Sequence, residues 1–94
     1  MLKIIFEYNV AVEKQEEYLK ATKETIKPFW ESKTCKSYSV WQVAENETGF
    51  VKEMLFEDKS VMKECMALEE AGPVKEIFFS FAGDISRKTC IQKI

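Results

Sequence analysis

Few side chains in this chain of 94 residues could carry out acid–base or nucleophilic chemistry. The sequence contains no histidine, which excludes catalytic triads, histidine-ligated metal ions and imidazole proton shuttles. Its three glycines form neither a phosphate-binding loop nor a nucleophile elbow. Cys35, Cys65 and Cys90 are widely spaced and form no C-x-x-C pair, so we expect free thiols, with no disulfide framework and no metal site.

The remaining candidates for chemistry are phenols and carboxylates. Tyr8 could donate a hydrogen bond in a pocket, or it could be a core tyrosine that bonds to the backbone. Glu7, Asn9 and Glu53 are predicted on the opposite strand face, where a half-buried carboxylate could act as a base or form an ion pair. A phenol with a pKa of about 10 is a poor general base at neutral pH, so this set favours binding over turnover.

Hydrophobic periodicity predicts the elements that must position these side chains. The expected strands span residues 2–10, 36–43, 50–57 and 87–94, and the expected helical regions span residues 12–32 and 60–81. Pro28 should kink the first helical region, and Gly72-Pro73 should interrupt and restart the second. Gly83 is a candidate for the end of the last helix.

The predicted order β-α-β-β-α-β is that of the ferredoxin-like α+β fold, with one antiparallel sheet and both helical regions on one face. A chain of 94 residues supports a single domain, residues 1–94. The net charge of −2 disfavours nucleic-acid binding. No apolar run approaches the ~20 residues of a membrane span or forms a signal peptide, so we expect a cytoplasmic protein.

Three segments carry a resemblance to a known group of proteins. They are IIFEY at 4–8, IKPFWES at 26–32 and KSYSVW at 36–41. Together with chain length and element order, they resemble the dimeric α/β-barrel superfamily, which includes antibiotic-biosynthesis-monooxygenase-like and stress-responsive barrel domains. The resemblance implies a homodimer in which two sheets pack face to face across a two-fold axis. It also implies a small ligand between each sheet and its helices.

One branch of that superfamily degrades haem, and this chain departs from its pattern. That branch carries an asparagine on the first strand, a tryptophan on the second helical region and a histidine further along. Here Tyr8 stands at the first-strand position, Asn9 is one residue out of phase, and residues 60–81 contain neither tryptophan nor histidine. This departure argues against haem degradation. It leaves open the cofactor-free monooxygenases of the superfamily, which rely on polar and aromatic pocket residues, and no cofactor is expected.

Strand and helix periodicity divides the candidate site residues into two sets. The first set should face the helices and line any pocket; it is apolar with two phenols and comprises Tyr8, Tyr38, Met54, Phe56, Met62, Cys65 and Phe78. The second set should form the dimer interface on the other sheet face, and comprises Ile5, Glu7, Trp41, Val43, Val51, Leu55 and Ile91. The helices can cover only one face, so the second set would otherwise be a large exposed apolar patch.

Three functions fit this sequence. The leading hypothesis is a module that binds a small hydrophobic or aromatic molecule between sheet and helices, with no catalysis. The second is a cofactor-independent monooxygenase or isomerase, and the third is a ligand-sensing regulatory domain. Any cavity should open near Pro28 or Gly72-Pro73, because irregular segments often border ligand sites.

Overall fold

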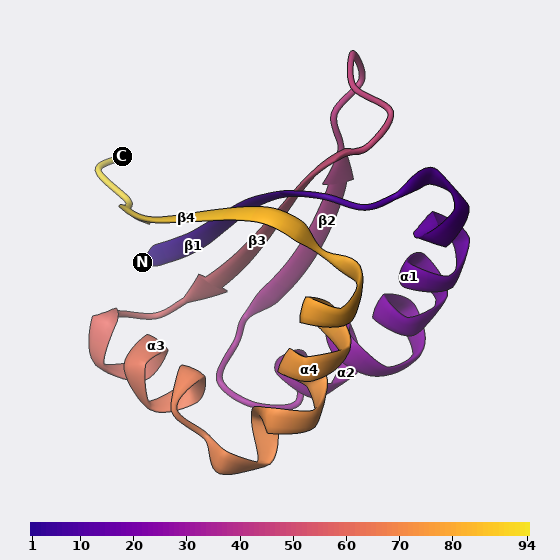
Figure 1. The fold of residues 1–94 in the computed structure, drawn as a ribbon. Coiled ribbons are helices and arrows are strands. Elements are labelled where there is room, and N and C mark those ends of the chain that lie inside the picture. Colours follow the sequence, from indigo (N-terminus) through magenta and orange to yellow (C-terminus); the bar gives the residue numbers. More distant parts are fainter.

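The computed structural model describes residues 1–94 and shows four strands with two broken helical regions (Figure 1). The strands are β1 (Leu2–Asn9), β2 (Ser37–Gln42), β3 (Gly49–Phe56) and β4 (Gly83–Ile91). The helices are α1 (Gln15–Ala21), α2 (Lys27–Glu31), α3 (Lys59–Met66) and α4 (Gly72–Phe81). The strand order is β2-β3-β1-β4 and every neighbouring pair is antiparallel, which confirms the predicted ferredoxin-like α+β fold.

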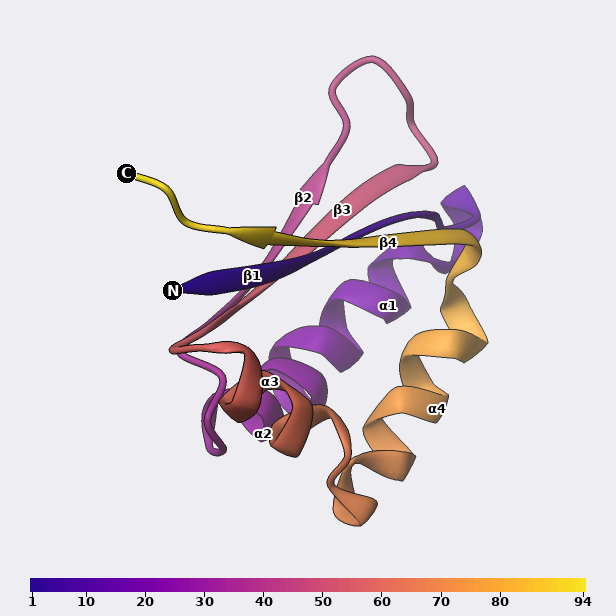
Figure 2. The ribbon, with the colours of Figure 1, turned by 90° about the vertical axis from the view of Figure 1, so that its left-hand side faces the viewer.

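All the helices lie on one face of the sheet, as the view along the sheet edge shows (Figure 2). Alternation along β1 buries Ile4 and Phe6 on that face, and the register places them opposite Met54 and Lys52 of β3. The core therefore sits between the central strands β1 and β3 and the helices, and its strand-side floor includes one lysine. No helix is long and apolar enough to cross a membrane.

The first helical region is broken just before its proline. A π-helical segment, Thr22–Ile26, separates α1 from α2, and Pro28 occupies the first turn of α2. Proline has no N–H to donate to the carbonyl four residues earlier, and its ring crowds that carbonyl. A widened π-turn ahead of Pro28 accommodates both effects. The irregularity expected at Pro28 is thus a π-helical turn, in which one extra residue is accommodated. The following turn, in α2, places Trp30 in the core.

The second helical region begins and restarts where the sequence predicts. The carboxylate of Asp58 accepts a hydrogen bond from the Val61 amide at 2.9 Å and caps α3. A 3-10 turn, Glu69–Ala71, follows, and α4 then begins at Gly72 with Pro73 in its first turn. Each restart directs a new apolar face toward the sheet.

The prediction for β4 is wrong at both ends. The strand was expected at 87–94, but it spans Gly83–Ile91, and Gly83 starts the strand rather than capping α4. Its register with β1 shifts at a β-bulge beside Asp84, which has a φ of 51°. Aspartate tolerates this left-handed conformation better than most residues do. The first four residues of the strand, 83–86, are mostly polar and do not alternate with apolar ones, so hydrophobic periodicity did not predict this part of β4.

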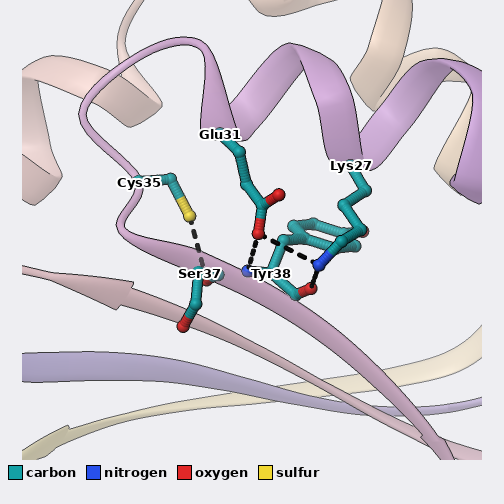
Figure 3. Close-up of polar contacts among 5 residues, drawn as sticks. All are labelled: Lys27, Glu31, Cys35, Ser37 and Tyr38. Atoms are coloured by element: carbon teal, nitrogen blue, oxygen red, sulfur yellow. Dashed lines mark hydrogen bonds and ion pairs between the residues drawn. The ribbon is translucent and has the colours of Figure 1, made fainter.

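The free edge of β2 is covered by two side chains from α2 (Figure 3). Lys27 Nζ donates to the backbone carbonyl of Tyr38 at 2.6 Å, and the Tyr38 amide donates to Glu31 Oε2 at 2.9 Å. Lys27 and Glu31 also form an ion pair at 3.0 Å. Unpaired strand edges otherwise offer a template for pairing with other chains. These contacts join α2 to the sheet and hold the pKa of Glu31 below its usual value through the hydrogen bonds from Lys27 and Tyr38.

Replacing Glu31 tests this edge contact. Glu31→Ala should lower the free energy of unfolding by about 1 kcal/mol at pH 7, measured by urea denaturation. The pKa of Glu31 is lower in the folded protein than its ordinary value of 4.5. The contact therefore stabilises the fold fully above pH 4.5, and this stabilisation is lost as the pH falls through the folded-state pKa. The difference from wild type should therefore shrink at pH 3. Glu24→Ala, an exposed change on the same helical region, is the control, and an equal loss in both variants would contradict the proposed contact.

Candidate binding cavity

A cavity of about 260 Å³ lies between the sheet and the helices. The sheet contributes Phe6, Lys52, Met54 and Arg87, and the helices contribute Trp30, Met66, Val74, Lys75, Phe78 and Phe79. Phe79 is 58% exposed and Arg87 is also exposed, so these two side chains stand at the mouth. The remaining lining is largely apolar and aromatic, which suits a small ligand with a ring.

Residues next to the two helix interruptions form part of the cavity wall. Trp30 comes two residues after Pro28, and Val74 and Lys75 directly follow Pro73. Neither helical region runs unbroken across the sheet, and the space lies where their broken ends meet it. The expectation that any cavity would open near one of the two interruptions holds only in part. Residues next to both interruptions line this cavity, but its mouth lies at Phe79 and Arg87, and a second hollow at the far end of the sheet borders neither interruption.

Lys52 is the unusual residue of this cavity. It lies on β3 between Phe6 of β1 and Val40 of β2, on the face that the helices cover, and it is 5% exposed. Its ammonium group has no carboxylate partner and donates no hydrogen bond to the protein. Aromatic faces surround it instead. Nζ lies 3.4 Å from the ring centroid of Phe78, 4.4 Å from that of Phe6 and 5.4 Å from that of Tyr38.

Burial lowers the pKa of Lys52 from 10.5 to about 7. The cause is desolvation, since a charged amine in an apolar site loses its hydration and gains only the weaker attraction of the ring faces. Nearby Cys35 acts in the opposite direction on Lys52, although the pKa of that thiol is itself raised by burial to about 11. At neutral pH the cavity therefore presents an amine that exchanges readily between its neutral and charged forms.

Every charged side chain that lines the cavity is cationic. Lys52 is joined by Lys75, whose Nζ donates to the carbonyl of Met66, and by Arg87, whose guanidinium carbon is 5.8 Å from the Phe6 centroid. No aspartate or glutamate is among the lining residues. The chain as a whole carries a net charge of −2, so this concentration of positive charge is local.

The structure brings only part of the predicted pocket set to the cavity. Met54 and Phe78 line it. Phe56, Met62 and Cys65 are buried in the core but are absent from the cavity wall. The hydroxyl of buried Tyr38 has no hydrogen-bond partner, and only its ring approaches Lys52.

Tyr8 has a structural partner away from this cavity. Its hydroxyl and that of Tyr18 hydrogen-bond to each other in the core, and both rings pack edge-to-face. Burial raises the pKa of both phenols, so both stay protonated at neutral pH. Tyr8 is thus a core tyrosine whose partner is a side chain rather than the backbone.

Sequence reasoning missed Lys52, although one signal could have found it. Residues 50, 52, 54 and 56 share one face of β3, and three of the four are apolar. The interruption of that apolar stripe by a lysine marks either a misplaced strand or a buried amine. The strand is not misplaced, because its other inward residues, Phe50, Met54 and Phe56, are apolar and fix its register against β1. A lysine on the same face therefore indicates a buried amine.

The opposite face of the sheet carries most of the predicted interface residues. Register places Glu7, Val51 and Trp41 side by side across β1, β3 and β2, and Trp41 is 61% exposed. Ile5, Val43 and Leu55 are half-buried on the same surface. Glu53 pairs with Lys3 at 3.3 Å there, as the ion-pair alternative expected.

The assignment of Ile91 to that face is wrong. Ile91 pairs with Leu2, whose side chain is buried against the helices, so Ile91 lies on the helix side of the sheet. It is nevertheless 66% exposed because it sits at the end of the edge strand. The face of Ile91 is set by its pairing with Leu2 across β1 and β4, which hydrophobic periodicity within β4 alone does not give.

A second hollow of about 300 Å³ lies at the far end of the sheet. Glu7, Asn9, Asp84 and Ser86 give it a polar lining, and Asn9 donates to the Asp84 carboxylate at 3.3 Å. It is shallower and more polar than the inner cavity and contains no buried titratable side chain at its wall except Tyr8. The inner cavity is therefore the better candidate site.

No protein-family model and no curated protein sequence matches this chain. Its structure aligns with an antibiotic biosynthesis monooxygenase at a TM-score of 0.78 and 16% identity, over 100% of both chains. This chain has the antibiotic biosynthesis monooxygenase-like fold. HapK from Hahella chejuensis aligns at a TM-score of 0.85 and 11% identity, over 99% of this chain and 93% of that one. SnoaB, a cofactor-independent oxygenase from Streptomyces nogalater, aligns at 0.78 and 9%, over 99% and 93%.

These comparisons confirm the fold that the resemblance of residues 4–8, 26–32 and 36–41 implied. At identities of 9 to 16% the likeness concerns the backbone fold, and it assigns no substrate to this chain. Within this antibiotic biosynthesis monooxygenase-like fold, the site is defined by the chain's own side chains.

Replacing Lys52 tests the burial of its amine. Lys52→Met should raise the free energy of unfolding at pH 7 by roughly 2 kcal/mol or more, because it removes an unpaired amine from an apolar site. The pKa of Lys52 is lower in the folded protein than in the unfolded chain. As the pH falls from 10.5 to about 7, the unfolded chain therefore takes up a proton that the folded protein does not, and wild type loses stability. Below about pH 7 both states are protonated, and there is no further loss. The gain should therefore be largest at pH 6 to 7 and should shrink toward pH 10.

Urea denaturation at pH 6, 8 and 10 measures this gain. Lys63→Met is the control, because Lys63 is an exposed lysine of α3 and its loss should change stability little at any pH. A Lys52→Met variant that is less stable than wild type at pH 7 would show that the amine has a stabilising partner.

Proposed function

We propose that this chain is a homodimeric α/β-barrel protein that binds a small hydrophobic or aromatic molecule between its sheet and its helices. The inner cavity is the observation that carries this proposal. Its walls include the rings of Phe6, Trp30, Phe78 and Phe79, and it is open at the Phe79 end. A volume of about 260 Å³ is at the small end for ligand pockets, which fits a ligand of one or two rings.

Narrowing the cavity should weaken ligand binding. The chain has two tryptophans: Trp30 lines the cavity and Trp41 lies on the opposite face of the sheet. In a Trp41→Phe variant, Trp30 is therefore the single fluorescent reporter of the cavity. Neutral two-ring arenes such as 2-naphthamide should change Trp30 emission saturably. Val74→Phe narrows the cavity without adding a second tryptophan to the emission signal, and it should weaken binding at least tenfold.

Leu19→Phe is the control, because Leu19 is exposed on α1 and lies outside the cavity lining. Binding that is equally strong in Val74→Phe and Leu19→Phe would place the ligand elsewhere. An absence of saturable binding across one- and two-ring arenes would contradict the binding proposal itself.

The outer sheet face supports the homodimer part of the proposal. Trp41, Ile5, Val51 and Leu55 give this face an apolar centre, and no helix covers it (Figure 2). Monomers rarely expose a contiguous apolar surface of this kind. The same patch on a second copy is self-complementary about a two-fold axis, which gives a closed dimer.

The dimer is tested by sedimentation. Wild type should sediment as a dimer at micromolar concentration, and Trp41→Glu should shift it to the 11.0 kDa monomer because it would place an unpaired carboxylate in the apolar contact surface. Ile91→Glu, on the helix side of β4, should leave the dimer in place. A stable wild-type monomer at micromolar concentration would contradict this assembly.

A second candidate function is a cofactor-independent monooxygenase or isomerase. Lys52 favours it, because an amine with a pKa of about 7 can take a proton from an acidic substrate at neutral pH, which a phenol cannot do. When the proton comes from a carbon, the resulting carbanion can add dioxygen to give a peroxide, which takes up the proton and loses water to leave a carbonyl group. In an isomerase the carbanion would instead regain the proton at another carbon. SnoaB, which shares the fold, is described as a cofactor-independent oxygenase. Oxygen uptake that is present in wild type and lost in Lys52→Met would favour this function over binding alone.

The cytoplasmic location also remains a proposal. Cys35, Cys65 and Cys90 are all free thiols, and free thiols are typical of reducing compartments.

A further inference from the structure

We propose that the molecule held in the inner cavity carries an acidic group, and that Lys52 is the residue that binds this group. The ligand class is an apolar, ring-containing carboxylate or acidic phenol rather than a neutral hydrocarbon. This inference rests on the proposed binding function and adds a chemical class to it.

The geometry around Lys52 leaves its amine without a polar partner. Nζ lies 3.4 to 5.4 Å from the ring centroids of Phe6, Tyr38 and Phe78, and the residue is 5% exposed. An ammonium group offers three N–H donors, and no carbonyl, hydroxyl or carboxylate of the protein accepts from it. Since Lys52 is part of the cavity wall, a ligand oxygen in the cavity is the acceptor that this amine can reach.

The charges around the cavity favour an anion. Two further cations line it, Arg87 from β4 and Lys75 from α4, and no carboxylate does. The other titratable groups that face Lys52 are the phenol of Tyr38 on β2 and the thiol of Cys35, and burial keeps both protonated at neutral pH. An anionic ligand would therefore meet the cations Lys75 and Arg87 and the titrating amine of Lys52, and no negative charge.

A structural role accounts poorly for these observations. Buried lysines that stabilise a fold are paired with a carboxylate, because an unpaired charge in an apolar site is costly. Leucine or methionine would fill the same place between Phe6 and Val40 without that cost. Recognition of an acidic ligand supplies the missing partner, since a charge-assisted hydrogen bond in a low-dielectric site is strong.

A matched pair of probes tests the inference by isothermal titration calorimetry. The acid is 2-naphthoate and its neutral isostere is 2-naphthamide, measured from pH 6.5 to 8.5, where the carboxylate stays ionised. Wild type should bind the acid at least tenfold more tightly than the amide at pH 6.5. Affinity for the acid should fall roughly ten- to thirtyfold by pH 8.5, because the free amine, with a pKa of about 7, must first take up a proton. Affinity for the amide should not change.

Three variants assign the effect to Lys52. Lys52→Met should bind acid and amide equally and lose the pH dependence, while Lys63→Met should behave as wild type. Arg87→Gln should reduce the preference for the acid only partly, because Arg87 stands at the exposed mouth. Urea denaturation of each variant confirms that it is folded.

The outcomes separate this inference from the function on which it rests. Equal affinity for acid and amide in wild type, or a preference that survives in Lys52→Met, would overturn the acidic ligand and leave the cavity as a neutral binding site. A preference lost fully in Arg87→Gln would also overturn the role given to Lys52. Binding of neither probe, with Trp30 emission unchanged, would contradict the binding function itself.

Discussion

The amine of Lys52 sits among aromatic rings with no carboxylate to offset its loss of hydration, and the rest of the site is arranged around it. The ring of Phe78 lies 3.4 Å from Nζ, measured to the centroid, and Phe6 pairs with Lys52 across β1 and β3. Ring faces return part of the lost hydration energy but not all of it. The remainder is a cost of folding that a bound acidic group would relieve, so stability and binding are coupled through one side chain.

The fold provides this site through its irregularities. The π-helical segment before Pro28 and the restart at Gly72 divide each helical region, and the cavity lies where the broken ends face the sheet. Lys27 and Glu31 join α2 to the free edge of β2 (Figure 3). The same helix carries Trp30, which is buried in the core. The helix interruptions thus define the cavity walls, while the regular strands β1 and β3 define its floor.

Much of the fold could be predicted from the sequence because alternation and helical spacing are strong signals in β1, β3 and the two helical regions. The inward positions of Met54 and Phe78 followed from those signals. Three features did not. Lys52 broke the apolar stripe of β3, and the polar start of β4 concealed four strand residues and a bulge. Ile91 was put on the wrong face because its pairing with Leu2 cannot be deduced from the periodicity of β4 alone. Tyr8 was placed correctly on the inward face, but only tertiary packing shows that its hydroxyl bonds to Tyr18.

The most direct measurement is the pKa of the Lys52 side chain in the ligand-free protein, followed by NMR titration of the ¹³Cε and ¹⁵Nζ resonances of labelled lysine. Comparison with Lys52→Met assigns the resonance. The account predicts one lysine that titrates at about pH 7, far below the ordinary value of 10.5. A pKa of Lys52 near 10 would mean that the amine is hydrated or paired in solution. That result would contradict both its burial and its role at the centre of the site.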